Sequence, residues 1–194
     1  MTRIISGLAG GRRIRTPPGA GTRPTSDRVR EALFSRLEHM DVLYRARVLD
    51  LYAGSGALGL EAASRGAASV LLVESEWSAV AVMRKNIAEL GLPGVRVEAD
   101  TVERALLDGP KTDDARCDLV LADPPYKVTE EVLGDVLALL VTHRWLSEDA
   151  FVVVERSARS PQPRWPQGLE GAGERRYGDT KMWFAGFAGP RGVA

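Results

Sequence analysis

The chain has 194 residues, of which 44% are hydrophobic and 27% are charged, and this suits one well-buried domain with an extension. A single cysteine, Cys117, excludes a disulfide framework and a cysteine-rich metal site, and two histidines speak against histidine-ligated zinc or a His-centred triad. We therefore expect no metal ion. The N-terminus has no long apolar stretch and no signal-peptide pattern, so we expect a cytoplasmic protein without a membrane segment.

The net charge is zero, but it is distributed unevenly along the chain. Residues 1–30 carry seven Arg and one Asp (+6), residues 31–155 carry twelve Lys or Arg and twenty-two Asp or Glu (−10), and residues 156–194 carry seven and three (+4). Basic ends around an acidic centre indicate that the ends contact a polyanion. A solvated charged surface would give the same pattern.

Residues 1–24 are predicted to form an N-terminal β-hairpin extension. Two short strands, 4–7 and 12–15, flank a glycine-rich turn, and a Pro/Gly-rich stretch follows up to residue 24. The hairpin has too few apolar residues for a core component, so we expect it to be an appended element. Its guanidinium groups would then be available to phosphates. The residues concerned are Arg12, Arg13 and Arg15.

A helix is predicted from about residue 25 to His39, because Ser26 and Asp27 are capping residues and an apolar stripe follows at helical spacing. Arg28 and Arg30 lie off that stripe. The stripe consists of Val29, Leu33 and Leu37.

The next segment predicts a strand, a glycine-rich loop and a helix. The strand covers residues 48–52, the loop contains Gly54 and Gly56, and the helix spans about residues 58–65. Glycines let the backbone approach a ligand closely, and a helix N-terminus offers free N–H groups and a partial positive charge. A second strand, Ser69–Val73, ends in Glu74, where a carboxylate can accept hydrogen bonds from ribose hydroxyls.

Short apolar strands and helices alternate through the rest of the chain, which predicts a parallel sheet with right-handed crossovers. Asp100 places a further carboxylate after one of these strands. A last pair of strands, about 174–177 and 182–187, spans Gly178 and Asp179 and predicts an antiparallel hairpin. The alternating elements are expected at Trp77–Leu90, Val95–Glu98, Cys117–Ala122, Glu130–Thr142 with Thr129 as its cap, and 151–154, and the Pro/Gly-rich run 160–173 leads to the hairpin.

The most informative motif is Asp123-Pro124-Pro125-Tyr126, which ends the apolar strand Cys117–Ala122. Two successive prolines cannot continue a central strand, so the backbone leaves the sheet at Asp123 in a stiff, extended conformation. At the carboxyl end of a strand, this places a carboxylate, free carbonyl groups and a phenol ring in the ligand-binding crevice. Acceptors for two amine hydrogens and a ring for stacking suit chemistry on a nucleobase amine. An ordinary Asp-Pro turn is the simpler alternative.

Taken together, the motifs resemble those of the bacterial small-subunit ribosomal RNA guanine-N2 methyltransferase family, over nearly the full length of the chain. The resemblance rests on four segments and implies a Rossmann-like class I methyltransferase fold, with S-adenosylmethionine as cofactor. The fold would be a mostly parallel seven-stranded sheet with an antiparallel C-terminal hairpin, in a domain covering residues 25–190. The segments are residues 3–7, residues 22–34, residues 50–56 with Asp123-Pro124-Pro125-Tyr126, and residues 177–180.

The resemblance also implies a role for individual residues. Gly54 and Gly56 would lie against the methionine part of the cofactor, and Asp50 would help to position that part. Ala53 and Ser55 would also bind the cofactor, with Glu74 at the ribose and Asp100 at the adenine. Asp123, Pro124, Pro125 and Tyr126 would form the catalytic motif. The partner would be small-subunit ribosomal RNA or an assembling 30S particle, bound by a monomer. The residues expected to contact the RNA are Arg12, Arg13, Arg15, Arg23 and Arg28.

Three other functions fit part of the sequence. The motif at Asp123 also suits a methyltransferase acting on adenine N6 in DNA or RNA. A nicotinamide-dependent oxidoreductase could use the glycines from Gly54 to Gly59 with Glu74, but this leaves Asp50 and the motif at Asp123 without a task. A non-catalytic RNA-binding protein would explain the basic ends but not the acidic residues at the strand ends.

Overall fold

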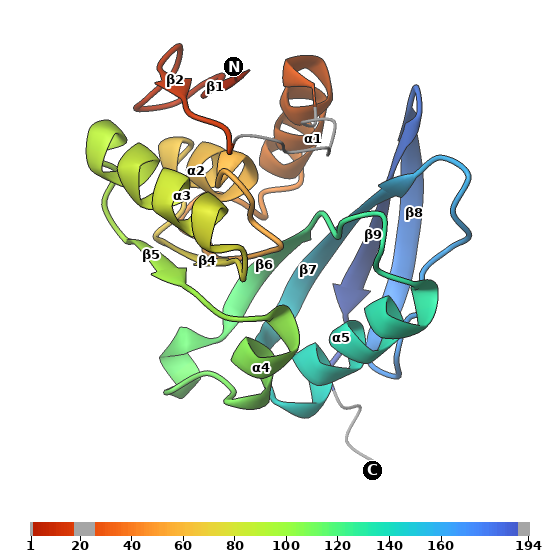
Figure 1. Cartoon of the computed structure of the whole chain (residues 1–194). Helices are drawn as coiled ribbons and strands as arrows, with labels where there is room; N and C mark the ends of the chain where they lie inside the picture. Colours follow the sequence, from red (N-terminus) through yellow and green to blue (C-terminus); the bar gives the residue numbers. More distant parts are fainter. Residues whose placement is uncertain (1, 18–25, 190–194) are drawn as a thin grey trace.

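A computed structural model describes residues 2–17 and 26–189, and within them a seven-stranded sheet forms the centre of the molecule (Figure 1). Its strand order is β5-β4-β3-β6-β7-β9-β8, and β9 runs antiparallel to both of its neighbours. The mostly parallel sheet with an antiparallel C-terminal hairpin is therefore confirmed. The strands are β3 (Arg47–Leu51), β4 (Ser69–Val73), β5 (Val95–Glu98), β6 (Cys117–Ala122), β7 (Leu146–Ser157), β8 (Leu169–Tyr177) and β9 (Thr180–Phe187).

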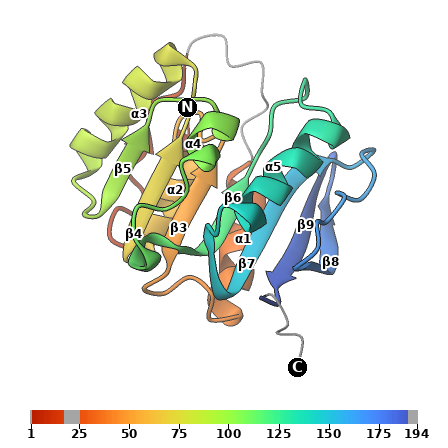
Figure 2. The ribbon, with the colours of Figure 1, turned by 90° about the horizontal axis from the view of Figure 1, so that it is seen from below.

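Helices cover both faces of the sheet. In Figure 1, α1, α2 and α3 lie on one face, and Figure 2 shows α4 and α5 in front of the other. No helix in the described ranges is both long and apolar enough to cross a membrane. The helices are α1 (Asp27–His39), α2 (Ala57–Ser64), α3 (Trp77–Leu90), α4 (Val102–Leu107) and α5 (Glu130–Thr142), with a short 3-10 helix at Asp113–Ala115.

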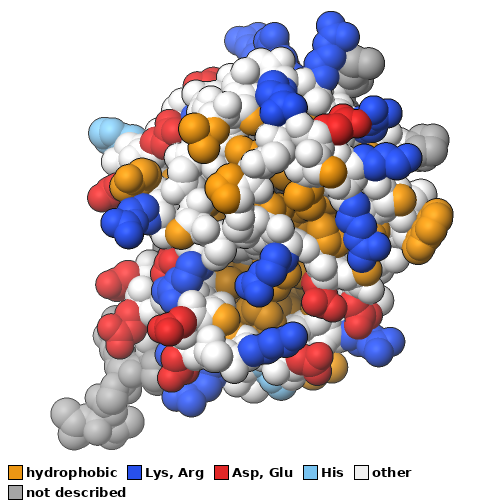
Figure 3. Space-filling view, turned by 90° about the vertical axis from the view of Figure 1, so that its left-hand side faces the viewer, with side chains coloured by type: hydrophobic (Ala, Val, Ile, Leu, Met, Phe, Trp, Pro, Cys, Tyr) orange, Lys and Arg blue, Asp and Glu red, His pale blue; other side chains and the backbone are white. Residues whose placement is uncertain are grey.

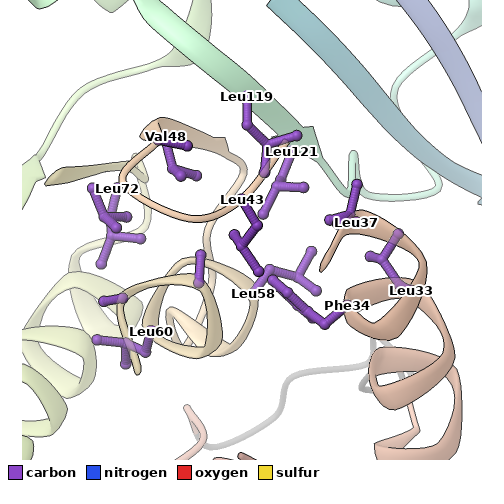
Figure 4. Packing of buried hydrophobic residues seen from close by; sticks show 14 of the residues in the cluster. Leu33, Phe34, Leu37, Leu43, Val48, Leu58, Leu60, Leu72, Leu119 and Leu121 are labelled. Carbon is purple, nitrogen blue, oxygen red and sulfur yellow. The ribbon is translucent and has the colours of Figure 1, made fainter. Parts of the chain in front are cut away.

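Two clusters of buried apolar side chains, one on each face, join the helices to the sheet. Leu33, Phe34 and Leu37 of α1 pack with Leu119 and Leu121 of β6 in the first cluster (Figure 4). The second cluster joins α4 and α5 to alternate residues of the same strands. The alternation follows from the pleat, which points successive side chains of a strand to opposite faces. Strands buried on both faces explain the continuous apolar runs in the sequence.

The boundaries of several helices follow from their capping residues. Ser26 and Thr129 each accept a hydrogen bond from the backbone N–H three residues later, and thereby begin α1 and α5 as predicted. Gly91 ends α3 in a left-handed conformation, with φ of 65°. These signals are local, which is why the sequence revealed them.

Several elements differ from the sequence-based expectation. Helix α4 was not predicted; it has only six residues and its cap, Thr101, accepts from Arg104 N–H. Strand β7 extends well beyond residues 151–154, and β8 begins at Leu169, within the Pro/Gly-rich run expected to be a linker. Pairing with β9 stabilises β8 in spite of its glycines, and β8 accommodates them through an irregularity between Gly171 and Glu174.

The N-terminal hairpin is part of the core, so the expectation that it has too few apolar residues is wrong. Its strands are β1 (Thr2–Arg3) and β2 (Arg13–Ile14), with β1 earlier than the predicted segment 4–7. Ile4 and Ile14 are fully buried in the cluster formed with α1 and α2. The proposed domain boundary at residues 24 and 25 lies outside the described residues.

Polar contacts hold the hairpin on α2. The buried Glu61 carboxylate accepts hydrogen bonds from Ile5 N–H (2.7 Å) and Ser6 N–H (3.1 Å), and Arg65 donates to the same group (2.7 Å). Charge-assisted bonds to a buried carboxylate are among the stronger ones in proteins. Gly7 fits closely against the end of α2, because a Cβ at this position would lie 1.9 Å from the Ser64 carbonyl oxygen.

Arg30 was expected to lie off the apolar stripe of α1, yet it is only 1% exposed. Its guanidinium group donates to the Arg3 carbonyl and to Asp27 (2.9 Å), and burial lowers its pKa in spite of the neighbouring carboxylates of Glu61 and Asp27. Arg30 therefore connects α1 to the hairpin through a buried hydrogen bond to the Arg3 carbonyl.

Because Ile14 is a core residue, we expect Ile14→Ala to lower the free energy of unfolding by about 2–4 kcal/mol. Leu8→Ala, on the same hairpin but at a side chain that is 80% exposed, is the matched control and should change it by less than about 0.5 kcal/mol. Urea denaturation measures both. Equal, small effects would mean that the hairpin is an appended element after all.

Candidate active site

The predicted site residues converge at the carboxyl edge of the sheet, where β3 and β6 lie side by side. The two strands run parallel, with Leu51 opposite Ala122. In the sheet, β4 and β5 lie on one side of β3, and β6, which follows them in sequence, lies on the other side. This is a topological switch point, where open α/β sheets bind their ligands. The glycine loop leaves β3 and the motif at Asp123 leaves β6 at this edge.

The glycine loop turns sharply from β3 into α2. Gly54 and Gly56 have φ of 56° and 81°, which other residues adopt only with strain, and Tyr52 is also left-handed at 61°. Open space surrounds the position where Gly54 would carry a Cβ. Backbone strain of this kind concentrates at ligand-binding sites.

Asp50, at 1% exposure, lies beneath this loop. Its carboxylate accepts a hydrogen bond from Gly59 N–H (2.8 Å) and so fixes the first turn of α2 to β3. Burial raises its pKa from 3.8 to about 7, against the lowering effect of that hydrogen bond. Asp50 thus supports the loop from below.

Glu74 and Asp100 follow neighbouring strands at the same edge. Glu74 accepts hydrogen bonds from Gly54 N–H (2.9 Å) and Glu76 N–H (2.8 Å), so its half-buried carboxylate is held against the glycine loop. Asp100 accepts from Thr101 N–H (2.8 Å) and lies 3.5 Å from the Arg104 guanidinium. Each carboxylate oxygen can accept more than one hydrogen bond, which leaves Glu74 able to bind hydroxyl groups.

The motif at Asp123 lines a cavity of about 370 Å³. Residues 123–126 form one wall, residues 155–157 of β7 and the turn 177–180 form the others, and Ser26 and Val29 contribute from α1. The Tyr126 side chain is 74% exposed at its rim. A ring at the rim of a polar cavity suits a flat ligand that enters from solvent.

Asp50, Asp123 and Glu155 form a row of carboxylates on one face of three adjacent strands. Asp123 and Glu155 each come one residue after the paired Ala122 and Val154. Burial, and then the charges of Glu155 and Asp50, raise the pKa of Asp123 well above its usual range, and Arg156 opposes this. In the described ranges no side-chain or backbone donor contacts the Asp123 carboxylate, and Asp123 belongs to the lining of the cavity.

Glu155, Arg156 and Tyr177 also line this cavity, and none of the three was predicted to be a site residue. Arg156 is held in place by hydrogen bonds to the Val128 carbonyl (3.0 Å) and the Glu130 carboxylate (2.5 Å). Glu155 follows an apolar run in the same way as Glu74 and Asp123 do, and this was the signal that could have revealed it.

The arginines predicted to contact RNA differ in their surroundings. Arg12 donates to the Leu90 carbonyl (2.9 Å) and to the Glu89 carbonyl, and Arg15 pairs with the Glu89 carboxylate (2.6 Å). Arg13 and Arg28 are exposed, and Arg23 lies outside the described residues. Of the hairpin arginines, Arg13 is therefore the one whose guanidinium group is best placed for a phosphate.

The site fits S-adenosylmethionine in its chemistry. The glycine loop and the start of α2 admit the close approach of a ligand, Glu74 would offer acceptors to ribose hydroxyls, and the row of carboxylates would suit a positively charged sulfonium. Asp100 follows β5, next to β4 in the sheet, where the other end of an extended cofactor would reach.

Comparisons with known proteins agree with this geometry. A family model described as Conserved hypothetical protein 95 matches residues 2–186. The chain is 35% identical over 180 residues to the putative rRNA methyltransferase YlbH of Bacillus subtilis, covering 92% of this chain and 95% of that one. It is 37% identical over 164 residues to the ribosomal RNA small subunit methyltransferase D of Escherichia coli, covering 84% and 79%.

Among solved structures, the putative methyltransferase yhhF from Escherichia coli matches with a TM-score of 0.83 and 33% identity, covering 97% of this chain and 99% of that one. Fold and site together define a Rossmann-like methyltransferase that depends on S-adenosylmethionine. The chain belongs to the family described as Conserved hypothetical protein 95.

We expect Glu74→Ala to weaken S-adenosylhomocysteine binding, because it removes acceptors for the ribose and the bond that holds Gly54 N–H. Isothermal titration calorimetry should show a loss of tenfold or more, which corresponds to about 1.4 kcal/mol. Glu76→Ala, at an exposed neighbour, is the control. An unchanged dissociation constant for Glu74→Ala would remove Glu74 from the cofactor site.

The raised pKa of Asp50 predicts a dependence of stability on pH. The folded chain binds this proton more tightly than the unfolded chain, so the stabilisation is complete below pH 3.8 and is lost as the pH rises through about 7. Asp50→Asn keeps an acceptor for Gly59 N–H but does not ionise. The free energy of unfolding of this variant minus that of the parent should therefore increase by about 2–3 kcal/mol between pH 5 and pH 8, because the parent loses stability and the variant does not. Parallel pH curves from urea denaturation would contradict the assignment.

Proposed function

We propose that this protein transfers a methyl group from S-adenosylmethionine to the N2 amine of a guanine in small-subunit ribosomal RNA, either free or in an assembling 30S particle. The observation that carries the proposal is the cavity at the carboxyl edge of the sheet, which is lined by Asp123 and by the exposed aromatic ring of Tyr126. Two relatives are named as rRNA methyltransferases, and we extend their substrate to this chain. Such a substrate places the protein in the cytoplasm.

The guanine amine is a poor nucleophile, because its lone pair is delocalised into the ring. The Asp123 carboxylate and a carbonyl of the motif would accept its two hydrogens and hold the nitrogen in line with the methyl group. The cofactor supplies the electrophilic methyl group. As the nitrogen–carbon bond forms and the sulfur–carbon bond breaks, positive charge develops on the nitrogen beside the acidic row, and a proton then leaves the nitrogen for a carboxylate or water.

Access to the amine requires that the base leave its stack. In a paired guanine the N2 group is engaged, so the nucleotide has to turn out of the helix into the cavity. Tyr126 at the rim would stack on the extruded base, which is worth about 1–3 kcal/mol. Pro124 and Pro125 fix the backbone that carries this ring, so little conformational entropy is lost on binding.

RNA would be held by the basic ends of the chain. On the side of the molecule seen in Figure 3, Lys and Arg side chains are interspersed with Asp and Glu, so on this side the contact would depend on individual arginines. Exposed Arg13 and Arg28 are the residues we assign to phosphates, with Arg12 and Arg15 able to contribute where their contacts to α3 allow.

The function is tested by methylating small-subunit RNA in vitro and analysing the nucleosides. We expect N2-methylguanosine from the parent protein and a rate lower by about 10²–10³ from Asp123→Ala, with S-adenosylhomocysteine affinity unchanged. Tyr126→Phe should retain most activity and Tyr126→Ala should lose it, since the ring face is what matters. N6-methyladenosine as the product would replace guanine by adenine as the substrate, and full activity of Asp123→Ala would refute the mechanism.

Arg13 is exposed whereas Arg12 donates to carbonyl groups of α3, so replacing each of them by Ala should have a different effect. Arg13→Ala should weaken RNA binding and make its logarithmic salt dependence shallower by about one phosphate contact, without changing stability. Arg12→Ala should chiefly lower the melting temperature, because it removes bonds to the α3 carbonyls. Fluorescence anisotropy at several salt concentrations, with a thermal melt for each variant, measures this. Identical salt slopes for Arg13→Ala and the parent would exclude Arg13 from the RNA interface.

A further inference from the structure

Asn86 of α3 is a buried polar residue, 1% exposed, that joins two segments far apart in sequence. Its side-chain oxygen accepts a hydrogen bond from Arg15 N–H (2.8 Å). Its side-chain nitrogen donates to the Arg15 carbonyl (3.0 Å) and to the Ser55 carbonyl (3.0 Å). One amide group thus connects the end of the N-terminal hairpin with the glycine loop that faces the cofactor.

The contact to Ser55 matters for the shape of the loop. Ser55 lies between Gly54 and Gly56, whose left-handed conformations leave the loop without a regular hydrogen-bond ladder. Holding the Ser55 carbonyl also fixes the plane of the peptide that carries Gly56 N–H, which donates to the Ala53 carbonyl (2.7 Å). The conformation of the loop at Ser55 and Gly56 therefore depends on Asn86.

The contact to Arg15 belongs to a larger set of bonds between the hairpin and the last turns of α3. Arg12 donates to the Leu90 carbonyl (2.9 Å), and the Arg15 guanidinium pairs with the Glu89 carboxylate (2.6 Å). These two contacts hold the hairpin but do not reach the glycine loop. Asn86 alone among them bonds to both segments, and an unpaired buried amide would be costly, so the three bonds favour one joint arrangement.

We infer that Asn86 is a positioning residue that couples docking of the N-terminal hairpin to the cofactor-binding conformation of the glycine loop. A substrate held by the hairpin then strengthens cofactor binding, and the cofactor strengthens substrate binding by the same factor. The inference goes beyond the proposed function, because it requires the cofactor and the hairpin but not any particular methylated nucleotide.

Asn86→Asp tests the contact itself. The substitution keeps the shape of the side chain and the acceptor for Arg15 N–H. It replaces the side-chain nitrogen, which donates to the carbonyls of Arg15 and Ser55, with an oxygen that cannot donate to them. We expect S-adenosylhomocysteine affinity, measured by isothermal titration calorimetry, to fall by about tenfold or more. Glu89→Gln, which weakens only the ion pair between hairpin and α3, should bind with the parent's affinity. Parental affinity of a folded Asn86→Asp protein would overturn the inference.

Ser64→Ala tests the coupling, because Ser64 holds the hairpin from the other side. Its hydroxyl accepts from Ala9 N–H (2.9 Å) and donates to the Ser6 carbonyl (2.6 Å). We expect this substitution to weaken S-adenosylhomocysteine binding several-fold in the parent but not in the Asn86→Asp background. An equal loss of affinity in both backgrounds, or no loss in the parent, would show that Asn86 does not couple the hairpin to the glycine loop.

Hydrogen exchange of Ser64→Ala gives a second measurement that needs no change at Asn86. Loosening the hairpin should speed exchange of the Ala9 amide directly and of the Gly56 amide through Asn86. Faster exchange at Ala9 with an unchanged rate at Gly56 would overturn the inference, even if the Asn86→Asp protein does not fold.

Discussion

The parallel pairing of β3 with β6 is the constraint on which the site depends. The two strands come from distant parts of the sequence and align with Leu51 opposite Ala122. Parallel strands end at the same edge, so the glycine loop and the motif at Asp123 leave the sheet side by side. Helix α2 then packs on one face and α5 on the other, and the motif at Asp123 lines a cavity at this edge. Neither motif could form a site without this pairing.

The same pairing concentrates negative charge in a poorly solvated place. Asp50, Asp123 and Glu155 share one face of three adjacent strands, and burial raises the pKa values of both Asp50 and Asp123. Ionising Asp50 and Asp123 costs stability, since buried carboxylates ionise reluctantly next to one another. A methyl donor with a positive sulfonium, and an amine that becomes positive as it reacts, would both relieve the repulsion. The groups that weaken the fold are thus those that suit the chemistry.

The hairpin shows how a short segment can become part of the fold through polar contacts. Glu61 accepts hydrogen bonds from two backbone N–H groups and from Arg65, and Ser64 bonds to both sides of the turn. Asn86 accepts a hydrogen bond from the N–H of Arg15, at the end of the hairpin. These bonds hold Ile4 and Ile14 in the core. The element expected to recruit RNA is therefore fixed against α2, which follows the glycine loop, and against α3.

The sequence by itself determined the class of fold, the order of its main elements and the candidate site motifs. Periodic apolar residues, helix caps such as Ser26 and Thr129, and acids after apolar strands are local signals, and they gave β4, β5, β6, α3 and α5 their correct bounds. Only the tertiary structure decided which polar groups meet: Asn86 with Ser55, Glu61 with the hairpin, and Glu155 with Asp123. It also decided that β8 forms from a glycine-rich run and that Arg12 binds α3. These outcomes depend on partners distant in sequence, and a residue's own neighbours carry no information about them.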